Sequence, residues 1–181
     1  MPDDAIKVNI SKTVDTKEIQ KFMKQAKINI LVGFPSGMQH VPTWHKKDPK
    51  KKNSYEGYNG EDPRDVDPVD TADLAIQLHY GTAEIPARPF LEDGIQQNIG
   101  RIKRAMQDEA TKLKETGKAN WSKVGTMAVG AITELVRGDY YKQRVPNSKK
   151  TIEYKGSDKP LIDGANMIQS LTFLVDGDDK E

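Results

Sequence analysis

The stretch from Leu74 to Leu91, LAIQLHYGTAEIPARPFL, decides the fold of this chain, because it predicts the end of one helix, a corner with two prolines and the start of the next helix. It begins as a short helix, in which apolar residues recur at helical spacing after Thr71, a residue type that caps helices. Gly81 lies where such a helix would end in a residue with left-handed backbone. The sequence therefore predicts that the chain leaves this helix at Gly81.

Two prolines stiffen the chain after that glycine. Ile85 and Arg88 each precede a proline and are pushed toward extended backbone, while Pro89 suits the first position of a new helix. We therefore predict a rigid corner at residues 81–91, called the elbow below. Its defining residues are Gly81, Pro86, Arg88, Pro89 and Phe90.

Arg88 stands out within the elbow. Its backbone is constrained by prolines on both sides, so its guanidinium has a defined direction and can form a bidentate pair with a carboxylate. We favour a role in tying the elbow to its own domain, and a contact between subunits is the alternative. Phe90 and Leu91 are expected in the core.

Downstream of the elbow the apolar residues follow the helical period closely and predict one long amphipathic helix over residues 89–114. These residues are Leu91, Ile95, Ile99, Ile102, Met106, Ala110 and Leu113. Gly94 and Gly100 within it indicate close backbone contact or a bend. The opposite face is basic, and Arg101 and Arg104 are candidate contacts with another subunit or partner.

A second helix is predicted over residues 121–137 and closes near Gly138. One side of this helix carries only small residues, Gly125, Ala128 and Ala131, and we expect this side to lie against the long helix. Residues 139–159 are polar and are expected to be irregular.

Strands are predicted near residues 5–10, 28–34 and 170–176, where apolar and polar residues alternate, and a helix is predicted after Asp15 or Thr16. The expected fold class is α+β, a single domain over residues 1–181 in which a small mixed β-sheet packs against the long helix and its neighbour. Residues 176–181 form an acidic tail.

A long loop insertion is expected over residues 37–70. Its charge is divided, since residues 46–52 hold five lysines and one aspartate whereas residues 61–73 hold six acids and one arginine. The two arms either attract each other as a solvated hairpin or reach a neighbouring subunit. The candidate interface residues in this loop are Trp44, Lys46, Lys47, Lys50, Lys51, Lys52, Asp65 and Asp67.

Composition excludes several kinds of chemistry. The chain has no cysteine, so it can form no disulfide, thiolate metal site or cysteine nucleophile, and its net charge of +1 selects no partner. The start of the chain lacks a long apolar run, and we expect neither a secretory signal nor membrane contact, with folding in a reducing cytoplasm. His79 and Glu84 could form an acid–base pair, but a helix-end histidine with an ordinary hydrogen bond is favoured. We expect no enzyme, no cofactor and no metal.

Three blocks of sequence resemble the neck, or tail-completion, proteins of tailed bacteriophages, including the Mu-type virion morphogenesis proteins. The elbow carries the family's I-P-x-R-P-F pattern as Ile85 to Phe90, residues 31–37 read LVGFPSG like its early strand and turn, and residues 159–172 read KPLIDGANMIQSLT like its ending. The blocks occur in the family's order. Tyr80 stands where the family usually has glutamate, and Gly164–Ala165 replaces the usual Thr-Gly.

The resemblance implies a structural head–tail joining protein of the virion. Such a protein assembles as a homo-oligomeric ring between the portal or connector of the capsid and the tail, and DNA passes through the lumen. Host cytoplasm during assembly and then the virion neck are the implied locations. Two alternatives stay open: a tail terminator that caps the tail tube, and an accessory protein that binds nucleic acid through the loop from Lys46 to Lys52.

Overall fold

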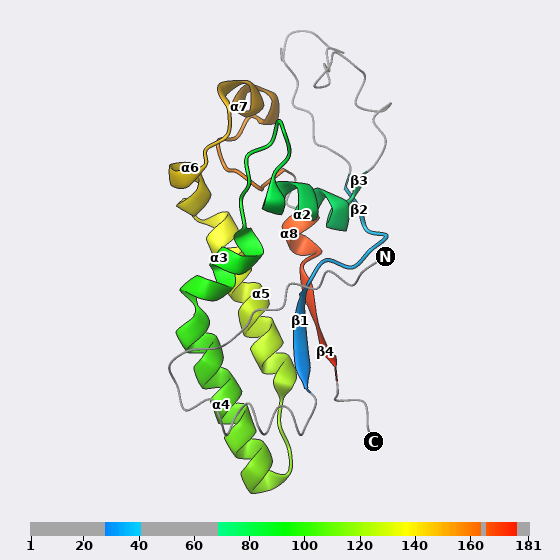
Figure 1. The fold of residues 1–181 in the computed structure, drawn as a ribbon, viewed down its shortest axis with the longest axis vertical. Coiled ribbons are helices and arrows are strands. Elements are labelled where there is room, and N and C mark those ends of the chain that lie inside the picture. The colour runs from blue at the N-terminus through cyan, green and yellow to red at the C-terminus, as the bar shows by residue number, and fades with distance from the viewer. Residues whose placement is uncertain (1–27, 41–68, 164–165, 177–181) are drawn as a thin grey trace. The chain divides into compact units, whose positions relative to one another are not determined.

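A computed structural model describes residues 28–40, 69–163 and 166–176, and Figure 1 shows their helices and strands. The chain divides into two compact units. In the described part, the first unit comprises residues 28–33, 91–133 and 171–176, and the second comprises 34–40, 69–90, 134–163 and 166–170. Each unit is described by itself.

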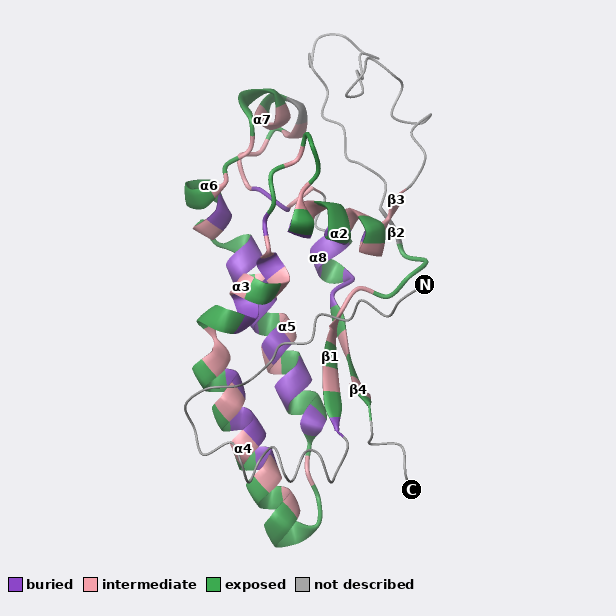
Figure 2. Ribbon diagram, in the orientation of Figure 1, coloured by how far each residue is buried: buried purple, intermediate pink, exposed green. Residues whose placement is uncertain are grey.

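The first unit joins a two-stranded ribbon to two long helices. Strand β1, Asn29–Gly33, pairs antiparallel with β4, Thr172–Asp176, in a register that places Leu31 opposite Leu174. Helices α4, Ile99–Thr116, and α5, Trp121–Arg137, lie side by side and are joined by a short turn (Figure 1). Their buried residues form the core of this unit (purple in Figure 2): Ile102, Ala105, Met106, Trp121, Val124, Ala128, Ala131 and Ile132.

The prediction of a single long helix over residues 89–114 is wrong, because this segment forms two helices: α3, Phe90–Gln97, and α4. Asn98 separates them, with φ −111° and ψ 10°. Its side-chain Nδ2 donates to Gly94 O at 3.2 Å, and its own carbonyl accepts from the backbone N of Arg101 and of Ile102 at 2.9 and 3.0 Å. Asn98 thus ends one helix and begins the next.

Glycines permit two close approaches in this unit. A Cβ on Gly94 would lie 2.7 Å from Ile132 Cα, so the close backbone contact predicted there is confirmed, whereas nothing lies within 4 Å at Gly100. At Gly125 a Cβ would lie 2.2 Å from the Phe173 ring. At Gly125, the side of α5 that carries small residues therefore packs against Phe173 of β4, whereas the sequence predicts that this side lies against the long helix.

In the second unit, helix α2, Thr71–Tyr80, packs against the short helix α8, Asn166–Gln169. A two-residue ladder of β2, Gln39–His40, and β3, Val69–Asp70, leads into α2. Asp70 caps α2, and the prediction that Thr71 would do so is wrong. Asp70 accepts from Gly37 N at 2.6 Å and from Ala72 N at 2.8 Å, and these bonds hold its pKa below the usual value.

Residues 139–159 are more regular than predicted. They contain helix α6, Tyr140–Arg144, and helix α7, Lys149–Lys155. Ser148 caps α7 by accepting from Thr151 N, and Gly156 ends it with φ 64°. The expectation of an irregular segment is therefore wrong for these two helices.

The predicted α+β class is confirmed, with a small antiparallel ribbon and several helices. The strand predicted near residues 5–10, the helix predicted after Asp15, most of the long loop and residues 177–181 of the acidic tail lie outside the described residues. Across residues 28–40, 69–163 and 166–176, none of the helices has the length and apolarity needed to cross a membrane.

Candidate functional site

The elbow begins at Gly81, where only glycine fits. Its backbone has φ 78° and ψ 173°, and its N–H donates to Gln77 O at 2.9 Å as the last bond of α2. A Cβ on this residue would lie 2.7 Å from Ala87 N and 2.8 Å from Ile85 O. Positive φ and lack of space both require glycine at this position.

A local hydrogen-bond network closes the elbow. Thr82 Oγ1 accepts from the backbone N of Glu84 at 3.2 Å and of Ile85 at 3.0 Å, and Thr82 N donates to Ile85 O at 2.8 Å. Arg88 N then donates back to Leu78 O on α2 at 2.9 Å. The chain is therefore held at both ends of the proline segment.

The Arg88 side chain is buried, with 4% of its surface exposed. Its Nε donates to Val145 O at 3.0 Å, and its Nη2 donates to Pro146 O at 3.3 Å and Asn147 Oδ1 at 3.4 Å. These acceptors are neutral oxygens of the segment between α6 and α7, where the sequence had suggested a carboxylate. Arg88 ties the elbow to a segment of its own chain more than fifty residues away.

A second cation lies close enough to influence this site. Burial is the main cause that lowers the pKa of Lys155, Asp163 acts to raise it, and the charge of Arg88 lowers it further. The Lys155 ammonium donates to Lys159 O at 3.0 Å. Burial also lowers the pKa of Arg88 itself. Two cations, Arg88 and Lys155, and the Asp163 carboxylate thus influence one another beside the elbow.

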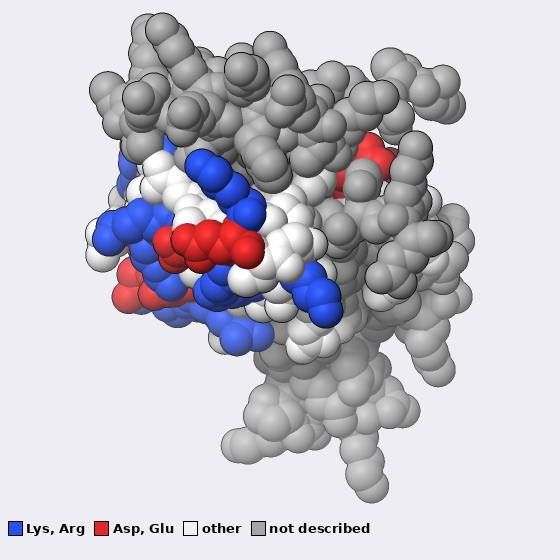
Figure 3. All heavy atoms as spheres, turned by 90° about the horizontal axis from the view of Figure 1, so that it is seen from below, with Lys and Arg blue, Asp and Glu red and all other residues white. Residues whose placement is uncertain are grey.

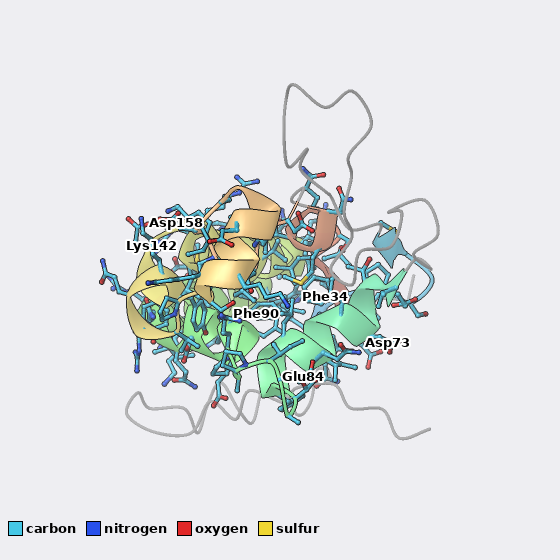
Figure 4. The ribbon with its side chains drawn as sticks, turned by 90° about the horizontal axis from the view of Figure 1, so that it is seen from above. Phe34, Asp73, Glu84, Phe90, Lys142 and Asp158 are labelled. Carbon is cyan, nitrogen blue, oxygen red and sulfur yellow. The ribbon has the colours of Figure 1, made fainter. Side chains whose placement is uncertain are left out.

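Aromatic rings fill the other side of the elbow. Phe90 is fully buried, and its ring meets those of Phe34 and His79 edge to face, with centroids 6.1 and 5.6 Å apart. Figure 4 shows Phe34 and Phe90 together in the interior, whereas Glu84 lies at the outside of its loop. His79 is buried with 4% exposure and also meets Tyr80, at 4.7 Å. This arrangement makes His79 part of the packing, and the ordinary hydrogen bond favoured from the sequence stays a prediction.

The candidate interface residues fall into two groups. Arg101 and Arg104 are exposed on α4, where Arg101 Nη1 donates to Asn98 Oδ1 and Arg104 Nε to Gly100 O, each at 3.2 Å. The remaining candidates lie outside the described residues: Trp44, Lys46, Lys47, Lys50, Lys51, Lys52, Asp65 and Asp67.

Sequence reasoning missed one charged site, at Glu109 in the first unit. Its side chain is 1% exposed, and its carboxylate accepts from Lys112 Nζ at 2.8 Å and from Asn120 N at 2.9 Å, with Lys123 Nζ at 3.5 Å. The Lys112 hydrogen bond, followed by the Asn120 N–H, lowers the pKa of Glu109 from 4.5 to about 2. The signal was present, because Glu109 follows Ile102 and Met106 at helical spacing on the apolar face.

Glu109 thereby joins α4 to the start of α5 across the turn. Figure 3, viewed from the end at which α4 leads into α5, shows Lys and Arg side chains with acidic side chains between them. Lys112 and Lys123 are about half exposed, so the buried carboxylate is neutralised from the solvent side. This arrangement is a structural clamp between two helices.

No group of metal-ligating side chains occurs among the described residues. Comparison with models of protein families, with curated proteins and with solved structures finds no match.

Proposed function

We propose that the protein is a structural component of the neck of a tailed bacteriophage. In this proposal its copies form a ring that joins the portal or connector of the capsid to the tail, and DNA passes through the lumen. Its function in this proposal is to bind neighbouring copies and other virion proteins, and not to catalyse a reaction.

The observation that carries the proposal concerns the three blocks that resemble the neck family. Phe34 comes from the first block and Phe90 from the elbow, and their rings pack against each other. Helix α8, from the third block, packs against α2, which leads into the elbow. Parts of all three blocks, which are separated by many residues along the chain, thus meet in the second unit, as expected if they specify a shared fold.

The burial of several side chains in these blocks supports a scaffold role. Arg88, Phe90, Leu161, Met167 and Leu171 are each at most 7% exposed. These five side chains therefore hold the fold together and are not presented to a substrate. Function would then depend on outer surfaces, as ring assembly requires two complementary surfaces on each subunit.

A conditional nonsense mutation in the phage that encodes the chain tests the proposal. A stop codon at Trp44 should yield DNA-filled heads and separate tails in a host without a suppressor, seen by electron microscopy. The same phage grown in a host whose suppressor inserts tryptophan is the matched control and should give joined particles. Joined, infectious particles without the protein would contradict the proposal, and tails of uncontrolled length would favour a tail terminator instead.

A further inference from the structure

The outer face of α2 exposes large apolar side chains. Ile76 and Tyr80 are 54% and 64% exposed and lie one helical turn apart. Met38 is 48% exposed, and its carbonyl accepts from both the backbone N and the hydroxyl of Thr71 at the start of the same helix. Large apolar side chains that a helix exposes on one face, as α2 does with Ile76 and Tyr80, are typical of an interaction surface.

The charged residues along this segment are all acidic. Residues 69–87 contain three acids, Asp70, Asp73 and Glu84, and neither lysine nor arginine. The Asp73 and Glu84 side chains are exposed, and Figure 4 shows both on the outside of the molecule. We call Ile76, Tyr80, Asp73 and Glu84 the α2 face.

The start of α4 has the opposite character. Residues 94–107 contain three cations, Arg101, Lys103 and Arg104, and no acid. Within the described part of the chain, Arg101 and Arg104 donate only to the neutral oxygens of Asn98 and Gly100. Gly100 is exposed, and a Cβ there would meet nothing within 4 Å. We call Gly100, Arg101 and Arg104 the α4 face.

We propose that the α2 face of one copy binds the α4 face of the next copy, head to tail. This inference rests on the proposed ring and names its contact surfaces. Asp73 and Glu84 would pair with Arg101 and Arg104, and Ile76 would cover the open backbone at Gly100. Guanidinium groups also stack on aromatic rings, as Arg144 does on Tyr140 within this chain at 4.8 Å, so Tyr80 can receive one of the two arginines.

The occupant is a second copy because the chain itself supplies the complement. Pairing two α2 faces would oppose acid to acid, and pairing two α4 faces would oppose cation to cation, so a symmetric dimer through either face is disfavoured. Binding between unlike faces is heterologous and repeats by rotation, which is the contact that a ring requires.

Cysteine crosslinking tests the contact directly, because the natural chain has no cysteine. The double variant I76C/G100C of the full chain, treated with a short bismaleimide at high protein concentration, should give a ladder of crosslinked multimers on a denaturing gel. The single variants I76C and G100C, mixed together, should stop at a dimer. The pair I76C/K118C, whose second position is exposed on the turn after α4, is the control and should give no ladder.

Charge-reversal variants provide a second test of the same contact. D73K/E84K in the crosslinking background should reduce the ladder about tenfold, and adding R101E/R104E should restore it. K114E/K118E, which makes the same change in net charge as R101E/R104E but at exposed positions elsewhere, should leave the ladder intact.

A ladder no stronger than that of the control pair, a crosslink within one monomer, or loss without restoration would overturn the proposed contact. These outcomes are independent of the phage experiment with the stop codon at Trp44. The neck assignment can therefore stand while the contact fails, and the reverse also holds.

Discussion

Arg88 carries its charge into the interior and meets only neutral acceptors among the described residues, the oxygens of Val145, Pro146 and Asn147. The variant R88M keeps most of the volume but removes every donor, which leaves the carbonyls of Val145 and Pro146 without this partner in part-buried surroundings. Each such loss costs about 1–3 kcal/mol, and we expect the free energy of unfolding to fall by about 3 kcal/mol. Urea denaturation checks this.

The matched control is R144M, because Arg144 is exposed on the neighbouring helix α6. Its substitution should change the free energy of unfolding by less than about 0.5 kcal/mol. Equal effects of R88M and R144M would contradict the role assigned to Arg88.

Glu109 makes the stability of the folded protein depend on pH in the acid range. Its pKa is about 2 in the folded state against a usual 4.5, so the unfolded state binds the proton more readily. The stability it contributes is present above pH 4.5 and is lost as the pH falls toward about 2. In E109Q the melting temperature should fall less steeply with pH over this range than in the natural protein.

The control for Glu109 is D108N, since Asp108 is the exposed acid beside it on α4. D108N should keep the steep loss of melting temperature below pH 4.5. If E109Q and the natural protein lose stability in parallel as the pH falls, the clamp does not control acid sensitivity.

Single residues were predictable where backbone geometry leaves few choices. Gly81 was expected to have positive φ, and it does, at 78°. The partners of Arg88 were not predictable, because the acceptors are oxygens of a segment more than fifty residues away that no local pattern connects to it. The burial of Glu109 was readable from its position on the apolar face of α4.

At the scale of elements, α5 and β4 show how glycine sets a packing distance. G125A would place a Cβ 2.2 Å from the Phe173 ring, whereas nothing lies within 4 Å at Gly130 on the same helix. We expect G125A to lower the free energy of unfolding by about 1–3 kcal/mol through overpacking. G130A should raise it by up to about 1 kcal/mol through better helix propensity. Thermal denaturation of the two variants compares them directly, and the same sign for both would contradict the packing of β4 on α5.

Periodicity located the elements that are long and that bury one face. The helix predicted over residues 121–137 and the strands near 28–34 and 170–176 agree with α5, β1 and β4. The break at Asn98 was missed because the apolar spacing continues undisturbed across it, while the polar amide and carbonyl of Asn98 divide the helix. Helices α6 and α7 were missed because five and seven residues are too short to show a period.

At the scale of the molecule, the described chain contains two compact units, and the sequence offered no sign of this division. The units are built from alternating segments of the chain, and composition changes at no single point between them. The single domain predicted over residues 1–181 stays a prediction. The ring and the virion location are also proposals at this scale, because they depend on copies and partners outside the chain.

The central claim is that the protein belongs to the neck of a tailed phage, and cryo-electron microscopy of virions purified from the phage proposed to encode it tests this claim most directly. The account predicts a ring of this polypeptide between the portal or connector and the tail, with DNA or an open lumen on its axis. Virions that lack the polypeptide, or that carry it elsewhere than between capsid and tail, would contradict the account.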